Sequence, residues 1–285
     1  MLGANVDSVW VTSKTVQSDS LLANRRTSMH PYIAPRDAVG SFRVSQDVLA
    51  LLRSEGFDLL VSTGAALAAV SLLRAPALLP TMYVESLARS EGPSLTGRAA
   101  SVRSSTALFT QHPNWARGRW SFAGSVLDTW VLAEPVARPD DKPMKILVTL
   151  GTIHPYRFDR LIDAVLEVAH EKDEITWQLG STTRVDLPGT VHSHLAAHDL
   201  LRVASESEVV VTHAGVGNVL MALSAGRVPV LGARQKLHRE HVDDHQRQLA
   251  AAVVSRGLGE QLDLSDPSRA ALQRAAGARV IDRLI

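Results

Sequence analysis

The feature that most constrains the fold is a regular alternation of short apolar runs and longer amphipathic stretches after residue 143. The apolar runs predict strands at 145–149, 175–178, 209–212 and 228–231, and the amphipathic stretches predict helices at 158–170, 196–206, 219–225 and 247–255. Strands that are apolar almost throughout and alternate with helices are typical of a parallel sheet with helices on both faces. We therefore predict a doubly wound α/β domain in this half of the chain.

The first half of the chain shows the same plan less clearly. It predicts strands at 8–12, 59–62 and 81–84 and a helix at 44–54. Three prolines and two aspartates gather at 134–143, which is the composition of a linker. The chain has 285 residues, which is about twice the commonest domain length. We therefore predict two Rossmann-like domains, at 1–134 and 144–285, joined by a linker at 135–143.

The composition excludes several classes of protein. The 45% of hydrophobic and 21% of charged residues are ordinary for a globular chain, and the lack of cysteine excludes disulfides and thiolate metal sites. The formal net charge of +1 gives no sign of a nucleic-acid partner. The most apolar stretch, 65–80, is interrupted by Arg74 and Pro76 and is too short to span a membrane, and residues 1–11 lack the pattern of a signal peptide. We expect a cytoplasmic protein without cofactors.

The sharpest local motif lies at 209–218, where a buried strand runs through a glycine turn into a helix. Gly215 and Gly217 let the backbone approach a ligand closely, and the following helix directs its free N–H groups and positive dipole end toward that ligand. A diphosphate fits such a place. The predicted donor-binding residues are His213, Ala214, Gly215, Val216, Gly217 and Asn218. The alternatives are a tight strand-to-helix turn without a ligand and a structural histidine.

A second polar cluster, 240–246, follows the next strand and leads into a helix. Carboxylate, imidazole and amide groups at a helix start can accept hydrogen bonds from sugar hydroxyls and donate to them. The predicted sugar contacts are Glu240, Asp244, His245 and Gln246. One alternative is a solvated, capped helix start. Another is a metal site, because His241 and His245 stand four residues apart, but the glutamate of the metalloprotease motif is missing and we expect no metal.

Two segments of the first half follow predicted strands and could contact an acceptor. The candidate acceptor-side residues are Ser62, Thr63, Gly64, Ser86 and Arg89. A simple turn is an equally good interpretation of the segment at 62–65. Glu85 is the candidate catalytic residue, because a carboxylate at the carboxyl edge of a sheet could deprotonate an acceptor hydroxyl. A plain ion pair between Glu85 and Arg89 is the alternative.

In their order along the chain, these motifs resemble those of one enzyme family. The first half contributes the segments 61–65, 83–89 and 92–97, and the second half contributes 148–152, 158–161, 212–217 and 241–246. The chain resembles bacterial exopolysaccharide glycosyltransferases, which are similar to a fusion of the two subunits of the eukaryotic enzyme that adds the second N-acetylglucosamine to a dolichol diphosphate sugar. The peptidoglycan N-acetylglucosamine transferase is related to this family.

The resemblance implies the GT-B architecture of two Rossmann-like domains facing a cleft, an inverting mechanism without a metal, and a UDP-sugar donor. It implies that Gly151 and Thr152 face the diphosphate together with 213–218, and that 244–246 face the sugar or ribose. One position departs from the family pattern. The glutamate attributed to ribose binding falls at Met221, which cannot accept a hydroxyl hydrogen bond. Glu240 is the candidate substitute.

The predicted function is the transfer of a hexosyl group from a UDP-sugar to a lipid-linked or saccharide acceptor in cell-surface polysaccharide synthesis. A nucleotide-sugar 2-epimerase is one alternative, and a non-catalytic subunit that binds a nucleotide sugar is another. Residues 89–119 contain five arginines and one acid, so we expect them to meet anionic headgroups at the inner face of the cytoplasmic membrane. The arginines are Arg89, Arg98, Arg103, Arg117 and Arg119.

A last expectation concerns the start of the first domain. Members of the family begin with a strand and a glycine–histidine loop ahead of the strand that matches 8–12, and residues 1–7 contain neither. In a doubly wound sheet this strand is central, and its loss exposes the edges of two neighbours. We therefore expect an N-terminal domain that lacks its first strand and is impaired in acceptor chemistry, unless a diverged strand fills the gap.

Overall fold

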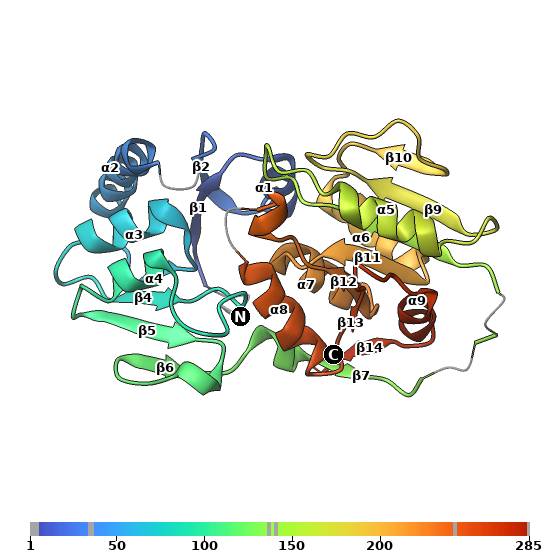
Figure 1. The fold of residues 1–285 in the computed structure, drawn as a ribbon. Helices are drawn as coiled ribbons and strands as arrows, with labels where there is room; N and C mark the ends of the chain where they lie inside the picture. Colours follow the sequence, from blue (N-terminus) through green and yellow to red (C-terminus); the bar gives the residue numbers. More distant parts are fainter. Residues whose placement is uncertain (1–5, 34–36, 136–137, 140–141, 242–243, 284–285) are drawn as a thin grey trace. The chain divides into compact units, whose positions relative to one another are not determined.

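The computed structural model describes residues 6–33, 37–135, 138–139, 142–241 and 244–283. Its contacts divide the chain into two units, Met1–Gly124 and Ser125–Ile285. Both units combine helices and strands (Figure 1). The division comes before the segment 134–143 that the composition marks as a linker, and residues 136–137 and 140–141 of that segment lie outside the described residues.

The first unit contains a four-stranded parallel sheet in the order β3-β4-β5-β6. Its strands are β3 (Leu60–Ser62), β4 (Thr81–Val84), β5 (Thr106–Thr110) and β6 (Trp120–Phe122), and its main helices are α2 (Ala38–Ser54), α3 (Ala65–Arg74) and α4 (Leu95–Ala100). A separate parallel pair consists of β1 (Val9–Ser13) and β2 (Arg26–His30), with the short helix α1 (Val16–Leu21) between them. The strands predicted at 8–12, 59–62 and 81–84 are confirmed to within a residue.

Apolar side chains on alternate strand positions hold the four-stranded sheet against its helices. Leu72 of α3 and Ala100 of α4 belong to one buried cluster with Tyr83 of β4 and Leu108 of β5. Each large side chain of this kind contributes roughly 1.5–3 kcal/mol when it is fully buried. The cluster therefore fixes the carboxyl ends of β4 and β5, from which the loops at 85–94 and 111–119 begin.

The second unit is built on a six-stranded parallel sheet in the order β10-β9-β8-β11-β12-β13 (Figure 1). Its strands are β8 (Lys145–Thr149), β9 (Glu174–Gln178), β10 (Thr190–His192), β11 (Val209–His213), β12 (Pro229–Gly232) and β13 (Glu260–Gln261). Its helices are α5 (Asp159–Val168), α6 (Ala197–Glu206), α7 (Val216–Ser224), α8 (His245–Val254) and α9 (Arg269–Ala276). An antiparallel pair, β7 (Trp130–Leu132) and β14 (Val280–Asp282), belongs to the same unit. This strand order is that of a Rossmann sheet.

Two hydrophobic cores cover the two faces of the six-stranded sheet. Ile146 and Val148 of β8 belong to one core, together with Leu161 of α5. Leu147, which lies between them in sequence, belongs to the other core with Ala222 of α7. Because successive side chains of a strand point to opposite faces, a strand that is apolar throughout serves both cores. The predicted doubly wound sheet is confirmed.

The predicted elements of this half agree with the observed ones apart from their ends. Helix α7 differs most, since it begins at Val216 rather than at 219. Gly215 and Gly217 conceal its first turn, because glycine is a poor helix former and reads as part of a turn. The pattern does not predict β10, β13, β14 or α9, which are short. Within the part of the chain that the structure describes, no helix combines the length and apolar character that crossing a membrane requires.

Candidate functional site

The carboxyl ends of β8 and β11 lie side by side at the point where the strand order of the second unit reverses. The loop after β8 leads to α5 and the loop after β11 leads to α7, and these helices pack on opposite faces of the sheet. Loops that part in this way leave a crevice, which is where open α/β sheets bind ligands. The predicted residues Gly151, Thr152 and 213–218 all lie at this edge of the sheet.

The start of α7 offers bare backbone to this crevice. Gly215 is the N-cap residue and has no side chain with which to cap the helix. Gly217 is exposed, and a Cβ added there would meet no heavy atom within 4 Å. A helix N-terminus carries about half a positive charge and several N–H groups without intrahelical acceptors. The first turn of α7 therefore offers an anion both charge and donors, with open space at Gly217.

His213 packs behind this turn and is uncharged. Its side chain is buried, its Nε2 would collide with a Cβ at Gly215, and the same atom would lie 3.0 Å from a Cβ at Gly151. Burial, followed by the positive charge of Arg234, lowers the pKa of His213 to about 3. The imidazole therefore stays neutral near pH 7 and can offer a diphosphate a hydrogen bond but no charge.

A buried hydrogen-bond network joins the ends of β8 and β11 to α7. The Asn218 amide donates to the hydroxyls of Thr149 at 3.1 Å and Thr212 at 3.0 Å. The Thr212 hydroxyl donates to the Thr149 carbonyl at 2.8 Å, and the Gln178 amide donates to the Thr149 hydroxyl at 2.9 Å. The side chain of Asn218, a predicted donor contact, thus serves to fix the first turn of α7 against the sheet.

The loop after β8 is held in place by the loop after β9. The Ser181 hydroxyl lies 3.1 Å from the Gly151 carbonyl and 2.7 Å from the Tyr156 carbonyl. Gly180 has a φ of +60° and passes so close to Gly151 that a Cβ would collide with its carbonyl. This packing leaves Thr152 exposed and Gly151 buried beside His213.

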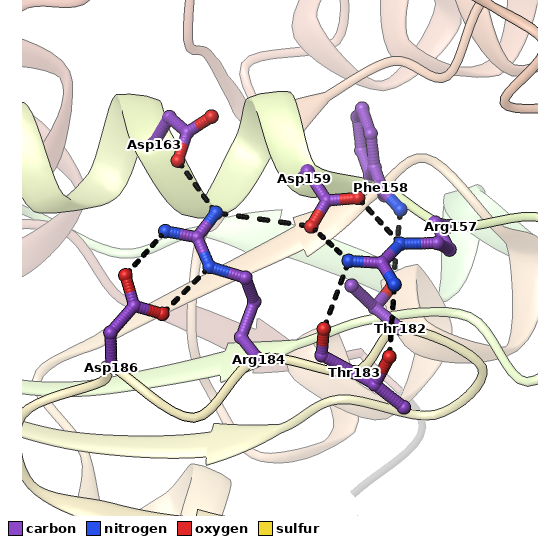
Figure 2. Close-up of polar contacts among 8 residues, drawn as sticks. All are labelled: Arg157, Phe158, Asp159, Asp163, Thr182, Thr183, Arg184 and Asp186. Carbon is purple, nitrogen blue, oxygen red and sulfur yellow. Dashed lines mark hydrogen bonds and ion pairs between the residues drawn. The ribbon is translucent and has the colours of Figure 1, made fainter.

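A surface network of arginines and aspartates extends the contact between these two loops (Figure 2). Arg157 binds Asp159 through two hydrogen bonds of 2.8 Å and Thr183 through two of 2.9 Å, to its hydroxyl and its backbone carbonyl. Arg184 binds Asp186 at 2.9 and 3.0 Å. The hydrogen bond from Arg157 lowers the pKa of the Asp159 carboxyl below its ordinary value. Exposed pairs contribute about 0.2–1 kcal/mol each, so this network orients the loop more than it stabilises the unit.

Glu240 does not face open space. Its carboxylate accepts hydrogen bonds from Arg160 of α5, from Nε at 2.7 Å and from Nη2 at 2.9 Å. The backbone N–H of Gln235 donates to the same carboxylate at 3.0 Å. The side chain is only 7% exposed. These bonds join the loop after β12 to α5 and give no support to the sugar or ribose contact predicted for Glu240.

Arg234 belongs to this site although no sequence motif predicts it. It lies two residues beyond the end of β12 and is fully buried. Its Nη1 would lie 2.6 Å from a Cβ at Gly151, and its guanidinium carbon lies 5.4 Å from the centre of the Phe158 ring. Nε has no hydrogen-bond partner in the described chain, and Nη2 has the Gly151 carbonyl at 3.5 Å. The sequence does hold one signal for it, since Arg234 is the first charged residue beyond the carboxyl end of an apolar strand.

The start of α8 positions two more of the predicted donor contacts. Gln246 is buried and accepts a hydrogen bond at its Oε1 from the backbone N–H of Arg234 at 3.1 Å. Its Nε2 has no partner among the residues described and remains available to a ligand. Asp244 is exposed and accepts from the backbone N–H of Lys236 at 2.9 Å. A sugar or ribose could therefore meet one amide donor and one carboxylate here.

The two histidines of this segment pack against each other. The rings of His241 and His245 meet edge to face with their centroids 4.7 Å apart, and Tyr156 lies 6.0 Å from His241. Residues 242–243 of the same motif lie outside the described residues. Among the residues that are described, no group of three or more histidine, aspartate or glutamate side chains could hold a metal ion.

In the first unit, Glu85 anchors a loop. It is only 1% exposed, and it accepts hydrogen bonds from the backbone N–H groups of Ser86 at 2.9 Å and Ser94 at 2.8 Å. The hydroxyls of Ser94 and Tyr83 donate to it at 3.0 and 3.2 Å. Both carboxylate oxygens are thus occupied by the loop between β4 and α4. These contacts support neither the predicted catalytic base nor the alternative ion pair with Arg89.

The two predicted acceptor segments come together at the carboxyl ends of β3 and β4. Ser62 ends β3, Thr63 is exposed, and Gly64 has a φ of +124°, a conformation that favours glycine. A Cβ at Gly64 would lie 3.9 Å from the Tyr83 hydroxyl, which donates to Glu85. Neighbouring parallel strands therefore bring these segments to one edge of the sheet.

A cavity of about 360 Å³ opens beside the loop that Glu85 anchors. Residues 91–93 of that loop line it, together with Trp115 and Trp120, whose ring centroids are 5.1 Å apart. Arg98 and Arg117 also line the cavity, are exposed, and have no partner in the described part of the chain. Free guanidinium groups beside aromatic rings could bind a ligand in which an anionic group is attached to a ring that packs on the aromatic side chains.

The five arginines of 89–119 do not form one free surface. Arg119 donates to the backbone carbonyls of four residues, including Thr106 at 2.8 Å. Arg103 donates to the carbonyl of Ala75 at 2.6 Å. These bonds tie the segment to its own unit. Of the five, Arg98 and Arg117 keep free guanidinium groups that could meet a ligand or a membrane surface.

Known proteins share sequence with part of the chain. No family model matches it. The UDP-N-acetylglucosamine transferase subunit ALG13 of Yarrowia lipolytica is 35% identical over 123 residues, which cover 38% of this chain and 59% of the relative. The chain thus spans less than two thirds of the length of that relative. The match supports the predicted resemblance to the eukaryotic N-acetylglucosamine transferase.

Solved structures match nearly the whole chain. MurG of Acinetobacter baumannii has a TM-score of 0.54 at 18% identity, over 93% of this chain and 79% of its own. The glycosyltransferase SnogD of Streptomyces nogalater has a TM-score of 0.54 at 17% identity, over 94% of this chain and 90% of its own. The fold is GT-B. The calicheamicin glycosyltransferase CalG4 also matches, with a TM-score of 0.53 at 17% identity, over 94% of this chain and 81% of its own. At such identities the likeness establishes the GT-B fold alone.

Proposed function

We propose that this chain is a glycosyltransferase that transfers a hexosyl group from a UDP-sugar to a lipid-linked or saccharide acceptor. One observation carries the proposal. At the switch point of the Rossmann sheet, the uncapped start of α7 lies beside Gly151 and a buried arginine, Arg234. Such a place favours a diphosphate. The partial match with a UDP-N-acetylglucosamine transferase subunit supports a UDP-sugar as the donor.

We assign the donor to the second unit. The diphosphate would lie on the first turn of α7, because Gly217 faces open space there. The sugar or ribose would contact the Nε2 of Gln246 and the carboxylate of Asp244, which is supported by the exposure of Asp244 and the unpaired amide of Gln246. Thr152, which is exposed beside this turn, would complete the contacts to the phosphates.

The proposed reaction is an inverting displacement without a metal. The acceptor hydroxyl attacks C1 of the sugar from the face opposite UDP, the bond between C1 and the diphosphate oxygen breaks, and a base accepts the hydroxyl proton. Negative charge then develops on the UDP leaving group. The dipole of α7 and the charge of Arg234 would stabilise it, as preorganised positive groups do in other group transfers.

For the acceptor we propose the cavity of the first unit lined by Trp115, Trp120, Arg98 and Arg117. An acceptor sugar could pack on the aromatic rings while its phosphate pairs with the arginines. Exposed arginines also favour anionic headgroups. We therefore propose that the enzyme works on a lipid-linked acceptor at the inner face of the cytoplasmic membrane, in polysaccharide synthesis.

The proposal is tested by binding first and turnover second. Thermal unfolding is measured with a panel of UDP-sugars and with GDP-mannose as a control, since a ligand at one hundred times its Kd stabilises the native state by about 2.7 kcal/mol. The UDP-sugar that stabilises most is then incubated with a lipid extract, and UDP release is measured together with a glycolipid product. Stabilisation by no UDP compound contradicts the proposal. Binding without transfer to any acceptor indicates a non-catalytic subunit.

A further inference from the structure

Within the described residues, no carboxylate forms a hydrogen bond or an ion pair with the guanidinium of Arg234. Arg234 has no exposed surface, its Nε is without a partner among the described residues, and the one acceptor of Nη2 is a carbonyl at the long distance of 3.5 Å. Burial lowers the pKa of Arg234 to about 10, so the group is still protonated near pH 7. Buried cations in proteins are normally paired with an anion, because leaving water unpaired is unfavourable.

The carboxylate whose charge acts on Arg234 is that of Glu240, and it already forms hydrogen bonds with other groups. Glu240 acts on Arg234 through its negative charge but binds Arg160 with two hydrogen bonds, and its third bond is to a backbone N–H. The charges of Glu240 and Arg160 offset each other. His213, which also adjoins Gly151, is neutral. Among the described residues, the charge of Arg234 therefore has no hydrogen-bonded anion beneath the carboxyl edge of the sheet.

This charge lies next to the bare start of α7. A Cβ at Gly151 would meet both Arg234 Nη1, at 2.6 Å, and His213 Nε2, at 3.0 Å, and a Cβ at Gly215 would collide with the same imidazole. The guanidinium and the imidazole thus both adjoin Gly151, and the imidazole also adjoins the N-cap residue of α7. Because Gly151 has no side chain, the layer of protein between the guanidinium and a ligand on the loop is thin.

We propose that Arg234 is a positioning residue that attracts the diphosphate of the donor through this layer. The contribution of Arg234 to affinity then increases with the number of negative charges on the ligand. Removing the charge of Arg234 therefore weakens diphosphates more than less charged ligands. A helix start alone attracts any anion weakly. A buried cation without a counter-ion adds a full positive charge that an anionic ligand can neutralise. The inference rests on the proposed function only in taking the diphosphate to be that of UDP.

The test compares ligands of different charge in matched variants. UDP, UMP, uridine and inorganic pyrophosphate are titrated into the wild type, Arg234→Met and Arg234→Lys, and the Kd values are measured by calorimetry. We expect Arg234→Met to weaken UDP about thirtyfold, UMP less, and uridine less than threefold, which is the range that a buried charge-assisted contact spans. Arg234→Lys keeps the charge and should retain more of the UDP affinity than Arg234→Met.

Arg227 provides a matched control at the other end of the same strand. It precedes β12 as closely as Arg234 follows it, is partly buried, and also has an Nε without a partner in the described chain. Arg227→Met should leave the ratio of UDP to uridine affinity unchanged. The free Arg234→Met protein should be no less stable than the wild type in thermal unfolding, because methionine replaces an unpaired buried charge.

Two outcomes overturn the inference. Equal weakening of UDP and uridine in Arg234→Met would show that the arginine only shapes the loop, and unchanged pyrophosphate affinity would show that its charge does not reach the ligand. These results are distinct from failure of the proposed function. Pyrophosphate binding that depends on Arg234, in a protein that no UDP-sugar stabilises, would support this inference and contradict the UDP-sugar donor.

Discussion

Each unit buries a glutamate beyond the carboxyl end of a strand, and the two carboxylates are satisfied in different ways. Glu85 accepts hydrogen bonds from two backbone N–H groups and two hydroxyls. Glu240 accepts two from a guanidinium and one from a backbone N–H. In both places the carboxylate holds a loop together. The difference is that neutral donors hold one loop, whereas a charge pair holds the other.

Two arginines, one in each unit, also differ in how their hydrogen-bonding groups are satisfied. Arg119 is exposed and its guanidinium donates to four carbonyls, whereas the guanidinium of the fully buried Arg234 has a single long hydrogen bond within the described residues. Solvation alone predicts more hydrogen bonds for the buried arginine than for the exposed one. Water can solvate an exposed cation, whereas a buried cation needs hydrogen-bond acceptors from the protein or a ligand. A buried polar group left unsatisfied is therefore a better marker of a ligand site than the exposed arginines of the first unit.

The two buried glutamates predict different losses of stability. Glu240→Gln leaves Arg160 partly buried without an anion, and we expect it to lower the free energy of unfolding by about 3–5 kcal/mol. Glu85→Gln keeps neutral partners and replaces one acceptor by a donor, so about 1–3 kcal/mol is expected. Urea unfolding of both variants measures the difference. Equal losses of unfolding free energy would show that the charge pair stabilises its loop no more than the neutral hydrogen bonds stabilise theirs.

A control for this prediction removes both charges of the pair. Arg160→Gln combined with Glu240→Gln should be less destabilising than the sum of the single changes, because neither charge is left alone. Strictly additive losses in the double variant would mean that the two side chains do not interact as the distances indicate.

The start of α7 predicts a large loss of affinity without a loss of stability. Gly217→Val places a side chain in space that is empty in the free protein, and valine is no worse than glycine in a helix. We expect UDP affinity to fall about a hundredfold, or roughly 2.7 kcal/mol, with little change in thermal unfolding. Gly56→Val is the control, because Gly56 in the first unit is also exposed with no heavy atom nearby. Unchanged UDP binding in Gly217→Val would remove the donor from this turn.

The buried His213 predicts that the stability of the second unit depends on pH. Its pKa is about 3 in the folded protein and about 6.5 when unfolded, so between these two values mainly the unfolded chain binds the proton. Stability is therefore complete above pH 6.5 and falls as the pH decreases toward 3, by at most about 1.4 kcal/mol per pH unit. Urea unfolding of the wild type and His213→Gln at pH 7, 6 and 5 isolates this term, since other groups titrate in both proteins. Parallel pH profiles would contradict it.

The sheet of the second unit was predictable because its central strands are buried on both faces. Val209, Val210 and Val211 of β11 are all buried, and such a run is visible in any sequence. The strand β10 was not predictable, since it is short and Thr190 and Val191 are exposed. Among the strands of this sheet, local pattern therefore reports those whose residues are nearly all packed in the interior more clearly than a short strand with an exposed surface.

The sequence predicted the parts of the candidate site that are formed by the backbone. It did not predict the parts that depend on which side chains pair with each other. Gly215 and Gly217 are visible because a bare helix start requires glycine. The pair of Arg160 and Glu240 is not visible, because its members are 80 residues apart in sequence. Glu85 was assigned a chemical role because a polar residue after a strand looks the same whether it faces solvent or the interior. Only the fold supplies its burial.

The free arginines of the first unit give the last and smallest prediction. Arg98→Gln combined with Arg117→Gln should weaken binding to anionic vesicles about fivefold for each charge removed at low salt, since one basic residue near an anionic surface contributes about 1 kcal/mol. Arg43→Gln with Arg53→Gln is the control, because these exposed arginines of α2 also have no partner among the described residues. Sedimentation with vesicles of anionic or neutral lipid measures the effect. Equal loss in both double variants would mean that net charge alone governs binding, and equal recovery on neutral vesicles would remove the membrane from the proposal.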